Sequence, residues 1–120
     1  MIATVRVTEK GKNSLIQLKR KTGIENWNTL CRWALVTSLA ESSVPPKEEA
    51  GQLSNIEMSW KTFGGDYADI YEAAFKQRLH EDQLPVSEAN QWFIVHLHRG
   101  ISYLNRKTSN ASDLLALLGE

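Results

Sequence analysis

The sequence predicts a mainly α fold: a compact helical domain with one short N-terminal strand and a single core. A chain of 120 residues is long enough for one hydrophobic core and too short for two ordinary domains. Its 42% of hydrophobic residues and four tryptophans are typical of a folded protein. Apolar residues recur at helical spacing over most of the chain and alternate as in a strand only in two short stretches. We expect one domain over residues 1–120, with a strand–helix–helix unit in 1–40, a loop and short extended segment in 41–65, and helices in 66–120.

The first stretch, ATVRVT (3–8), alternates in polarity and predicts a short strand with Val5 and Val7 on its buried side. Thr8 is a suitable N-cap for a helix that continues to about Lys21. Gly23 is well placed to end that helix in the left-handed conformation. At 100° per residue, the buried stripe of this helix is predicted to contain Gly11, Leu15, Leu18 and Thr22.

A second helix is predicted over residues 26–40, and it is apolar on two faces. One face carries Trp27, Leu30, Cys31, Ala34 and Leu35, and the nearly opposite face carries Trp33, Val36 and Ala40. A helix that is apolar almost all round is buried on two sides. In so small a chain the second partner is expected to be another subunit, so Trp33 and Val36 predict a homo-oligomer.

The second half begins with a loop over SSVPPKEEAG (42–51), because paired prolines and charges break any regular pattern. Ile56, Met58 and Trp60 alternate, which predicts an extended segment ending at the glycine pair 64–65. Asp66 is the expected N-cap of the next helix, which continues to about residue 82. The predicted inward stripe of that helix consists of Tyr67, Ile70, Tyr71, Ala74, Phe75 and Leu79.

The C-terminal part is predicted to contain a long helix and a short one. Ser87 is a suitable cap for a helix that continues to about Lys107, and residues 113–118 form a short apolar helix. In the preceding helix, Arg78 projects into the apolar stripe and needs a partner, because an unpaired buried charge costs several kcal/mol. We expect an acid on another helix or subunit, which assigns Arg78 to the oligomer interface. The alternative is a long side chain that reaches solvent.

The stretch HLHRG (96–100) resembles a metal or catalytic motif at first sight. Because it lies within the predicted long helix, His96 and His98 are about 200° apart and point in different directions. Two ligands on one helix face need a spacing of three or four residues. We therefore expect both histidines to pack against the core and assign them no metal.

Few other residues indicate catalysis. Cys31 lies on the inner face of its helix and is expected to act as a small buried hydrophobe. Asp69 and Glu72 share a helix face and either hold Mg²⁺ or form a solvated face with Lys76. The sequence has no phosphate-binding glycine loop, paired-cysteine motif or nucleophile elbow. We therefore assign no catalytic residue, metal or cofactor.

The location of the protein is predicted from what the sequence lacks. No apolar run approaches the roughly 18 residues that a membrane span needs. The N-terminus has no apolar signal segment, and a single cysteine cannot form an intramolecular disulfide. We expect a cytoplasmic protein without a membrane partner.

The net charge of zero hides a strong asymmetry along the chain. Residues 1–40 carry seven basic and two acidic side chains (+5), whereas residues 41–90 carry four basic and ten acidic ones (−6). Cations concentrated in one region are typical of a surface that binds phosphate. The predicted DNA contacts are Lys10, Lys12, Lys19, Arg20, Lys21 and Arg32. The alternative is that the cations at residues 19–21 only complement the dipole of their helix.

Four stretches carry a resemblance to a known family: LKRKTGIENWNTLCRWAL (18–35), SWKTFGGDYADIY (59–71), KQRL (76–79) and HLHRGISYL (96–104). In this order they resemble the DndE family, the small subunit of the bacterial and archaeal DNA phosphorothioation machinery, from about residue 4 to 107. The resemblance implies a homotetramer that binds DNA, preferentially nicked duplex, while sulfur replaces a non-bridging phosphate oxygen. It also implies three partners: a sulfur-transferring reductase-like subunit, an ATPase subunit and a cysteine desulfurase. Lys19 and Lys21 match the family's basic stretch, with Arg20 between them.

Two other functions remain open from the sequence. The strand–helix–helix order of residues 1–40 is similar to that of ribbon-helix-helix transcription regulators, whose strands pair between two chains. In such a regulator Thr4, Arg6 and Thr8 would read bases in the major groove. The other alternative is a nicking endonuclease that uses Asp69 and Glu72, or His98.

Overall fold

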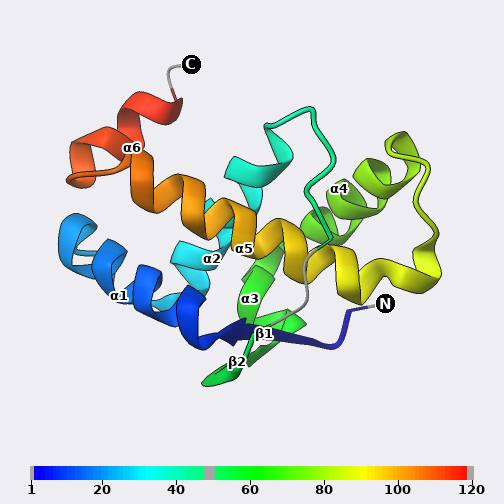
Figure 1. The fold of residues 1–120 in the computed structure, drawn as a ribbon, viewed down its shortest axis with the longest axis horizontal. Helices are drawn as coiled ribbons and strands as arrows, with labels where there is room; N and C mark the ends of the chain where they lie inside the picture. Colours follow the sequence, from blue (N-terminus) through cyan, green and yellow to red (C-terminus); the bar gives the residue numbers. More distant parts are fainter. Residues whose placement is uncertain (1, 48–50, 119–120) are drawn as a thin grey trace.

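The computed structural model describes residues 2–47 and 51–118, and it has the mainly α fold that the sequence predicts (Figure 1). The long helix α5 crosses the whole molecule, with α1 and α6 near one end, α4 near the other, and a two-stranded sheet on one side. The elements, in chain order, are β1 (Thr4–Thr8), α1 (Glu9–Thr22), α2 (Trp27–Leu39), β2 (Leu53–Ser59), α3 (Trp60–Gly64), the 3₁₀ turn η1 (Gly65–Tyr67), α4 (Ala68–Glu81), the 3₁₀ turn η2 (Val86–Glu88), α5 (Ala89–Lys107) and α6 (Ala111–Leu118).

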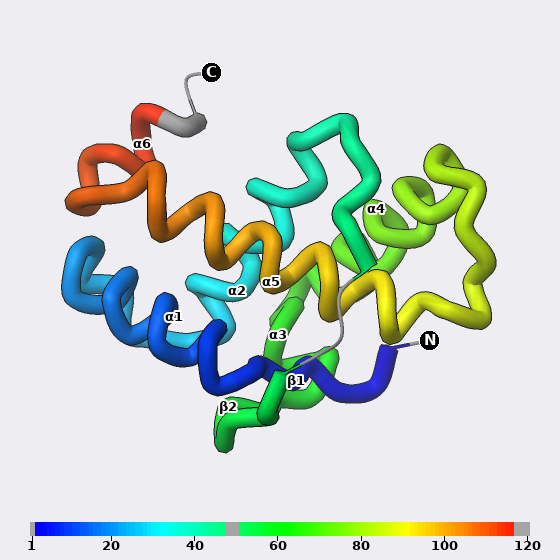
Figure 2. The backbone as a smooth tube through the Cα atoms, viewed as in Figure 1, coloured from blue at the N-terminus to red at the C-terminus, as the bar shows by residue number. Residues whose placement is uncertain are grey.

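The N-terminal strand has the predicted faces but an unpredicted partner. Val5 and Val7 are fully buried, whereas Arg6 is exposed. β1 pairs antiparallel with β2 of the same chain, in the register that places Thr4 opposite Ser59. Figure 2 shows the backbone returning beside β1 after the loop that follows α2. In a ribbon-helix-helix regulator this strand pairs with a strand of a second chain. Because β1 pairs with β2 of its own chain, the structure argues against the regulator alternative.

Helix α1 begins and ends where its capping residues predict. The Thr8 Oγ1 atom accepts a hydrogen bond from the Gly11 backbone N–H at 3.1 Å. At the other end Gly23 has φ +75°, and its N–H donates to the Lys19 carbonyl. Leu15 and Leu18 are fully buried, which confirms the predicted stripe.

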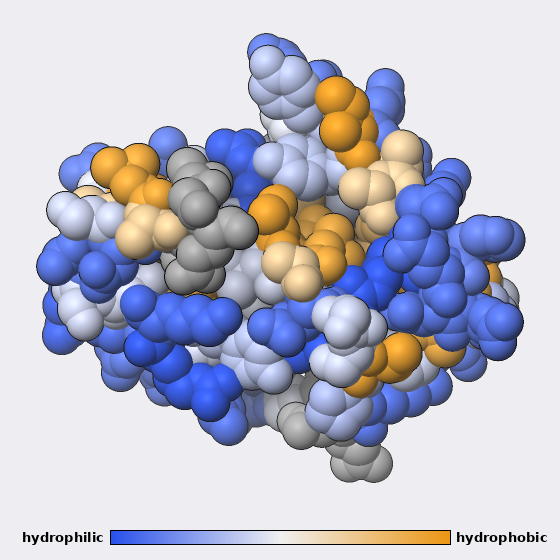
Figure 3. All heavy atoms as spheres, turned by 90° about the horizontal axis from the view of Figure 1, so that it is seen from above, coloured by the Kyte–Doolittle hydropathy of each residue, from blue (hydrophilic) through white to orange (hydrophobic). Residues whose placement is uncertain are grey.

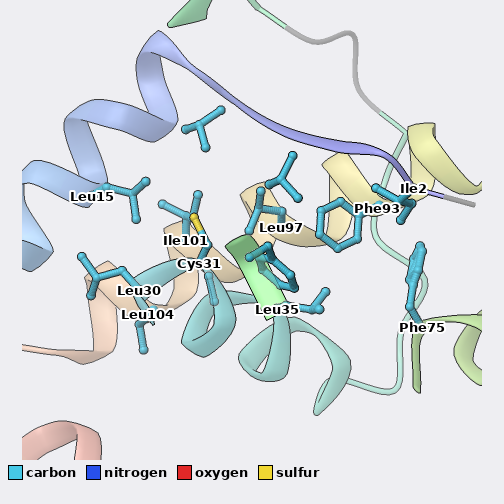
Figure 4. Packing of buried hydrophobic residues seen from close by; sticks show 14 of the residues in the cluster. Ile2, Leu15, Leu30, Cys31, Leu35, Phe75, Phe93, Leu97, Ile101 and Leu104 are labelled. Atoms are coloured by element: carbon cyan, nitrogen blue, oxygen red, sulfur yellow. The ribbon is translucent and has the colours of Figure 1, made fainter. Parts of the chain in front are cut away.

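The core lies where α2 crosses α5 (Figure 4). Leu30, Cys31 and Leu35 of α2 are fully buried, as are Leu97 and Leu104 of α5. The backbones approach closely because residue 100 is glycine: a Cβ there would lie 1.7 Å from the Ala34 carbonyl oxygen. No larger residue allows this contact.

The second face of α2 is only partly covered. Trp33 is half-buried and packs against the core of its own chain. Val36 is 51% exposed, which is unusual for a large apolar side chain. The predicted contact with another subunit at Trp33 and Val36 therefore remains a prediction.

The extended segment ends earlier than predicted, because Trp60 begins helix α3. The Ser59 hydroxyl accepts a hydrogen bond from the Thr62 N–H at 3.1 Å and caps that helix. The turn places the Trp60 ring 4.9 Å from Phe63 and 5.2 Å from Phe93, between ring centroids. The residues predicted to end the strand therefore form helix α3, and the Trp60 and Phe63 rings of this helix pack in an aromatic cluster.

The predicted inward stripe of α4 is only half correct. Phe75 and Leu79 are fully buried and Tyr71 is half-buried. By contrast, Tyr67 is 64% exposed, Ile70 is 63% exposed, and Ala74 is also exposed. Ala68, in the first turn of α4, is nevertheless buried, and its carbonyl oxygen accepts a hydrogen bond from Trp60 Nε1 at 3.1 Å.

Three predicted helix starts also change. Asp66 and Ser87 cap no helix, because they lie within the 3₁₀ turns that precede α4 and α5. Helix α6 begins at Ala111 rather than 113, where Asn110 Oδ1 accepts from the Asp113 N–H at 3.3 Å. Over the described residues, no helix combines the length and apolar character needed to cross a membrane.

Candidate nucleic-acid interface

Helix α1 carries its cations in two rows, one on each side of the buried stripe. Lys10 and Lys21 lie on the side that faces α5. The Lys21 Nζ donates to the Asn105 carbonyl oxygen at 3.0 Å and to its side-chain Oδ1 at 2.9 Å. Lys10 is exposed, and among the described residues it has no hydrogen-bond or ion-pair partner. Eleven residues of helix separate the two lysines by about 16 Å.

The second row, Lys12 and Lys19, faces β2 and α2. The Lys12 Nζ donates to Asn55 Oδ1 at 2.7 Å. The Lys19 Nζ lies 4.7 Å from the centre of the Trp27 ring, in a cation–π contact. These neutral partners leave both charges uncompensated.

Arg20 lies between the two rows, opposite the buried stripe, and is exposed. Lys19, Arg20 and Lys21 occupy the last turn of α1, where cations complement the helix dipole. Lys10 and Lys12 lie near the first turn, where the dipole disfavours cations. The helix dipole therefore explains only part of the basic face, which is defined here as Lys10, Lys12, Lys19, Arg20 and Lys21.

The structure does not bring Arg32 together with this basic face. Its Nη1 donates to the Phe63 carbonyl oxygen at 3.0 Å, and its Nη2 donates to Thr29 Oγ1 at 3.2 Å. The half-buried guanidinium thus ties α2 to α3. These bonds give Arg32 a structural role, and its assignment to DNA contacts remains a prediction.

A second group of cations surrounds Tyr103 on α5, and the sequence reasoning missed it. The Arg106 Cζ lies 4.8 Å, the Lys107 Nζ 5.8 Å and the Arg99 Cζ 6.0 Å from the ring centroid. The spacing of residues 99, 103 and 106 on one helix was visible in the sequence and could have indicated this cluster. We call these four residues the Tyr103 cluster.

The partner of Arg78 lies within its own chain, so Arg78 needs no acid from another subunit, and its place at an oligomer interface remains a prediction. The side chain is buried, and its Nε donates to Asp82 Oδ2 at 2.8 Å, one turn along α4. Its remaining nitrogens donate to three carbonyl oxygens, that of Leu39 at the end of α2 and those of Glu41 and Ser43 just after it, at 2.6–2.9 Å. A guanidinium carries five N–H donors on one planar group, so Arg78 can make all of these hydrogen bonds at once. The bonds hold the end of α2 and the residues after it against α4.

His96 and His98 are packed residues, as predicted. Buried His96 has its Nδ1 2.8 Å from Ser38 Oγ, which also accepts from Arg99 Nε. Burial, helped by Arg78 and Arg99, lowers the pKa of His96 to about 4. Burial also lowers the pKa of His98. Its Nε2 accepts from the Thr8 N–H at 3.0 Å, so Nδ1 carries the proton and donates to the Ile94 carbonyl.

The remaining candidates for chemistry are Cys31 on α2 and two carboxylates on α4. Cys31 is fully buried, and burial raises the pKa of its thiol to about 12, so the thiol stays protonated at neutral pH. Asp69 is exposed and Glu72 is half-buried on α4. Within residues 2–47 and 51–118, no group of three or more His, Cys, Asp or Glu side chains is placed to hold a metal ion.

Comparisons with known proteins point to one family. Residues 4–112 match the sequence model of the DNA sulphur modification protein DndE. No curated protein matches the chain.

Several solved chains share the fold, and two of them are DndE structures. DndE from Escherichia coli B7A, involved in DNA phosphorothioation modification, is 20% identical, with a TM-score of 0.72 over 87% of this chain and 98% of that one. A glycine-to-lysine mutant of DndE, involved in DNA phosphorothioation, is 17% identical, with a TM-score of 0.66 over 88% and 99%. At these identities the two structures establish similarity of fold alone.

Proposed function

The chain belongs to the DndE family of DNA sulphur modification proteins, because the family match covers residues 4–112, and from this premise we propose that it is a DNA-binding subunit of the phosphorothioation machinery. The observation that carries the proposal is the basic face of α1. Its cations near the first turn oppose the helix dipole, and no carboxylate among the described residues pairs with them. Contact with a phosphate would offset the unfavourable interaction of these cations with the helix dipole.

The proposed contacts are made to the phosphate backbone rather than to bases. Lysine side chains on a helix exterior neutralise phosphates and release counterions, which gives affinity without sequence preference. The two rows extend about 16 Å along α1, so one copy reaches several phosphates. Choice of the modified sequence then belongs to other subunits.

A preference for nicked duplex follows from the same electrostatics. A nick makes the duplex easier to bend, so an assembly with several basic faces engages more phosphates for less deformation energy. We propose that the assembly is a homotetramer in the cytoplasm. Its proposed partners are a reductase-like sulfur-transferring subunit, an ATPase subunit and a cysteine desulfurase.

The salt dependence of DNA binding tests the proposed surface. The double variant Lys10→Ala, Arg20→Ala removes two exposed charges that have no partner among the described residues. Each lost phosphate contact lowers the slope of log affinity against log salt by about 0.9, so the double variant should lose roughly two units. Lys19→Ala with Lys21→Ala should act in the same way. Affinity for a nicked 30-base-pair duplex is measured by fluorescence anisotropy at several salt concentrations.

The control is Lys76→Ala, which removes an exposed charge from α4 and should leave the slope unchanged. The thermal midpoint of each variant checks that folding is intact. If both double variants keep the parental affinity and slope, α1 is not the DNA surface.

A further inference from the structure

Tyr103 forms a wall of two adjacent hollows on the surface of α5. On one side lies a cleft of about 710 Å³ between the first turns of α1, the middle of α5 and the loop between α2 and β2, lined in part by Lys10, Pro45, Arg99 and Tyr103. On the other side a shallower hollow of about 400 Å³ is lined by Glu41, Tyr103, Arg106 and Lys107. A single aromatic ring therefore separates a deeper cleft from a cationic recess.

The geometry points to a binding site for one unpaired nucleotide of DNA. We propose that its base enters the larger cleft and stacks on Tyr103, while the adjoining phosphates bind Arg106 and Lys107. This inference rests on the proposed function, and it names the part of a DNA strand that the Tyr103 cluster takes.

The larger cleft has the size and lining that a base requires. Ligand sites of about 300–1,000 Å³ hold small organic groups, and 710 Å³ lies within this range. Ile94 and Val95 supply apolar surface, and the hydroxyls of Ser14 and Ser102 supply polar groups for base edges. Aromatic walls of this kind bind single-stranded nucleic acid because every base has a π face.

The cations of the Tyr103 cluster differ in how firmly they are held. Arg99 donates to the carbonyl oxygens of Ser38 and Ser43, so it stays in place beside the ring. Arg106 is exposed, and its guanidinium contacts the Tyr103 ring. Lys107 lies 3.9 Å from Glu41, with side chains 47% and 41% exposed. An exposed pair of this kind contributes little, so Lys107 can exchange Glu41 for a phosphate.

A paired base cannot reach this cleft, because the duplex keeps it stacked between neighbours. The occupant is therefore a nucleotide at a gap, a flap or a displaced strand. Lys10 lies at the rim of the cleft and also belongs to the basic face of α1. The phosphates beside an unpaired nucleotide can thus continue onto the surface proposed for duplex.

The test uses the whole protein and duplexes that carry one 2-aminopurine in a single-nucleotide flap at a nick. Stacking on Tyr103 should quench the fluorescence of this base on binding. Tyr103→Leu should abolish the quenching and weaken binding of the flap duplex roughly tenfold, whereas Tyr103→Phe should keep both. Binding of intact duplex should change less than twofold in either variant, because phosphate contacts on α1 remain.

Glu41→Gln separates binding from a merely structural role. Loss of the carboxylate removes repulsion of the incoming phosphate and frees Lys107, so affinity for the flap duplex should rise about twofold. If the parent binds duplex but Tyr103→Leu keeps the quenching and the flap affinity, the nucleotide site is refuted and the proposed function stands. If the parent binds neither duplex nor flap, the proposed function itself fails.

Discussion

Among single residues, His96 is a buried imidazole whose surroundings disfavour its charged form. Its ring is fully buried between α2 and α4, beside the Phe75 ring at 5.9 Å between centroids. The guanidinium groups of Arg78 and Arg99 oppose any charge on it. Because Arg99 Nε donates to Ser38 Oγ, the serine hydroxyl can donate to His96 Nδ1 and keep the imidazole neutral.

This environment predicts that acid destabilises the fold. The pKa of His96 is about 4 in the folded chain and 6.5 in an unfolded one. Above pH 6.5 neither state binds the proton, so His96 adds no pH dependence. Between pH 6.5 and 4 only the unfolded state takes it up, and the free energy of unfolding should fall by about 3 kcal/mol. Urea denaturation at pH 7, 6, 5 and 4 measures this loss.

His96→Gln is the control for the acid prediction. Because glutamine does not titrate, the variant should lose most of the pH dependence, whatever its stability at pH 7. The pKa of His98 is also lowered, so a smaller slope of the same sign should remain. An identical slope in parent and variant would assign the acid sensitivity to other groups.

At the scale of elements, the crossing of α2 and α5 depends on Gly100. Alanine is the better helix former, and on an exposed helix Gly→Ala stabilises by roughly 0.5–1 kcal/mol. Here the added Cβ would meet the Ala34 carbonyl oxygen at 1.7 Å and its carbonyl carbon at 2.4 Å. Both are backbone atoms, so the helices must separate.

Gly100→Ala should therefore destabilise the protein by about 3 kcal/mol, despite its better helix propensity. Thermal or urea unfolding followed by circular dichroism measures the change. Ser102→Ala, at an exposed position of the same helix, is the matched control and should alter stability by less than about 0.5 kcal/mol. Equal stability of parent and Gly100→Ala would mean that the two helices do not pack this closely.

At the scale of the whole molecule, exposed apolar side chains form separate patches rather than one continuous surface. Figure 3 shows several such areas (orange) divided by polar ones on the face seen from above. The large exposed hydrophobics include Val36 on α2, Tyr67 and Ile70 near the start of α4, and Val86 in η2. Exposed apolar side chains that are scattered in this way are normal on protein surfaces, so they do not by themselves locate a contact with another subunit.

The predicted homo-oligomer is best tested at Val36. Trp33→Glu would put a charge against the core of its own chain, because Trp33 packs there. Val36→Glu changes a side chain that is 51% exposed, so it should leave the monomer folded while dissociating the assembly. Sedimentation velocity at micromolar concentration gives the mass. Val86→Glu, at another exposed apolar position, should keep the parental mass, and a monomeric parent would refute the prediction.

The sequence by itself determined what depends on neighbours within about four residues. Helical periodicity, the Thr8 cap and the Gly23 cap located α1, and the charge pattern located its basic face. The same reasoning placed His96 and His98 on different sides of their helix, because the angle between two side chains on a helix is a local property. It failed at Asp66 and Ser87, where short 3₁₀ turns replace a side-chain cap.

Only the tertiary structure decided which distant groups meet. The pairing of β1 with β2 and the Arg78 contacts with the segment after α2 join residues more than 30 positions apart. The same is true of the bond between Lys21 and Asn105. The two hollows beside Tyr103 likewise combine α5 with α1 and the end of α2. The physical reason is that such contacts depend on how whole helices pack, whereas periodicity reports only which face of a helix is buried.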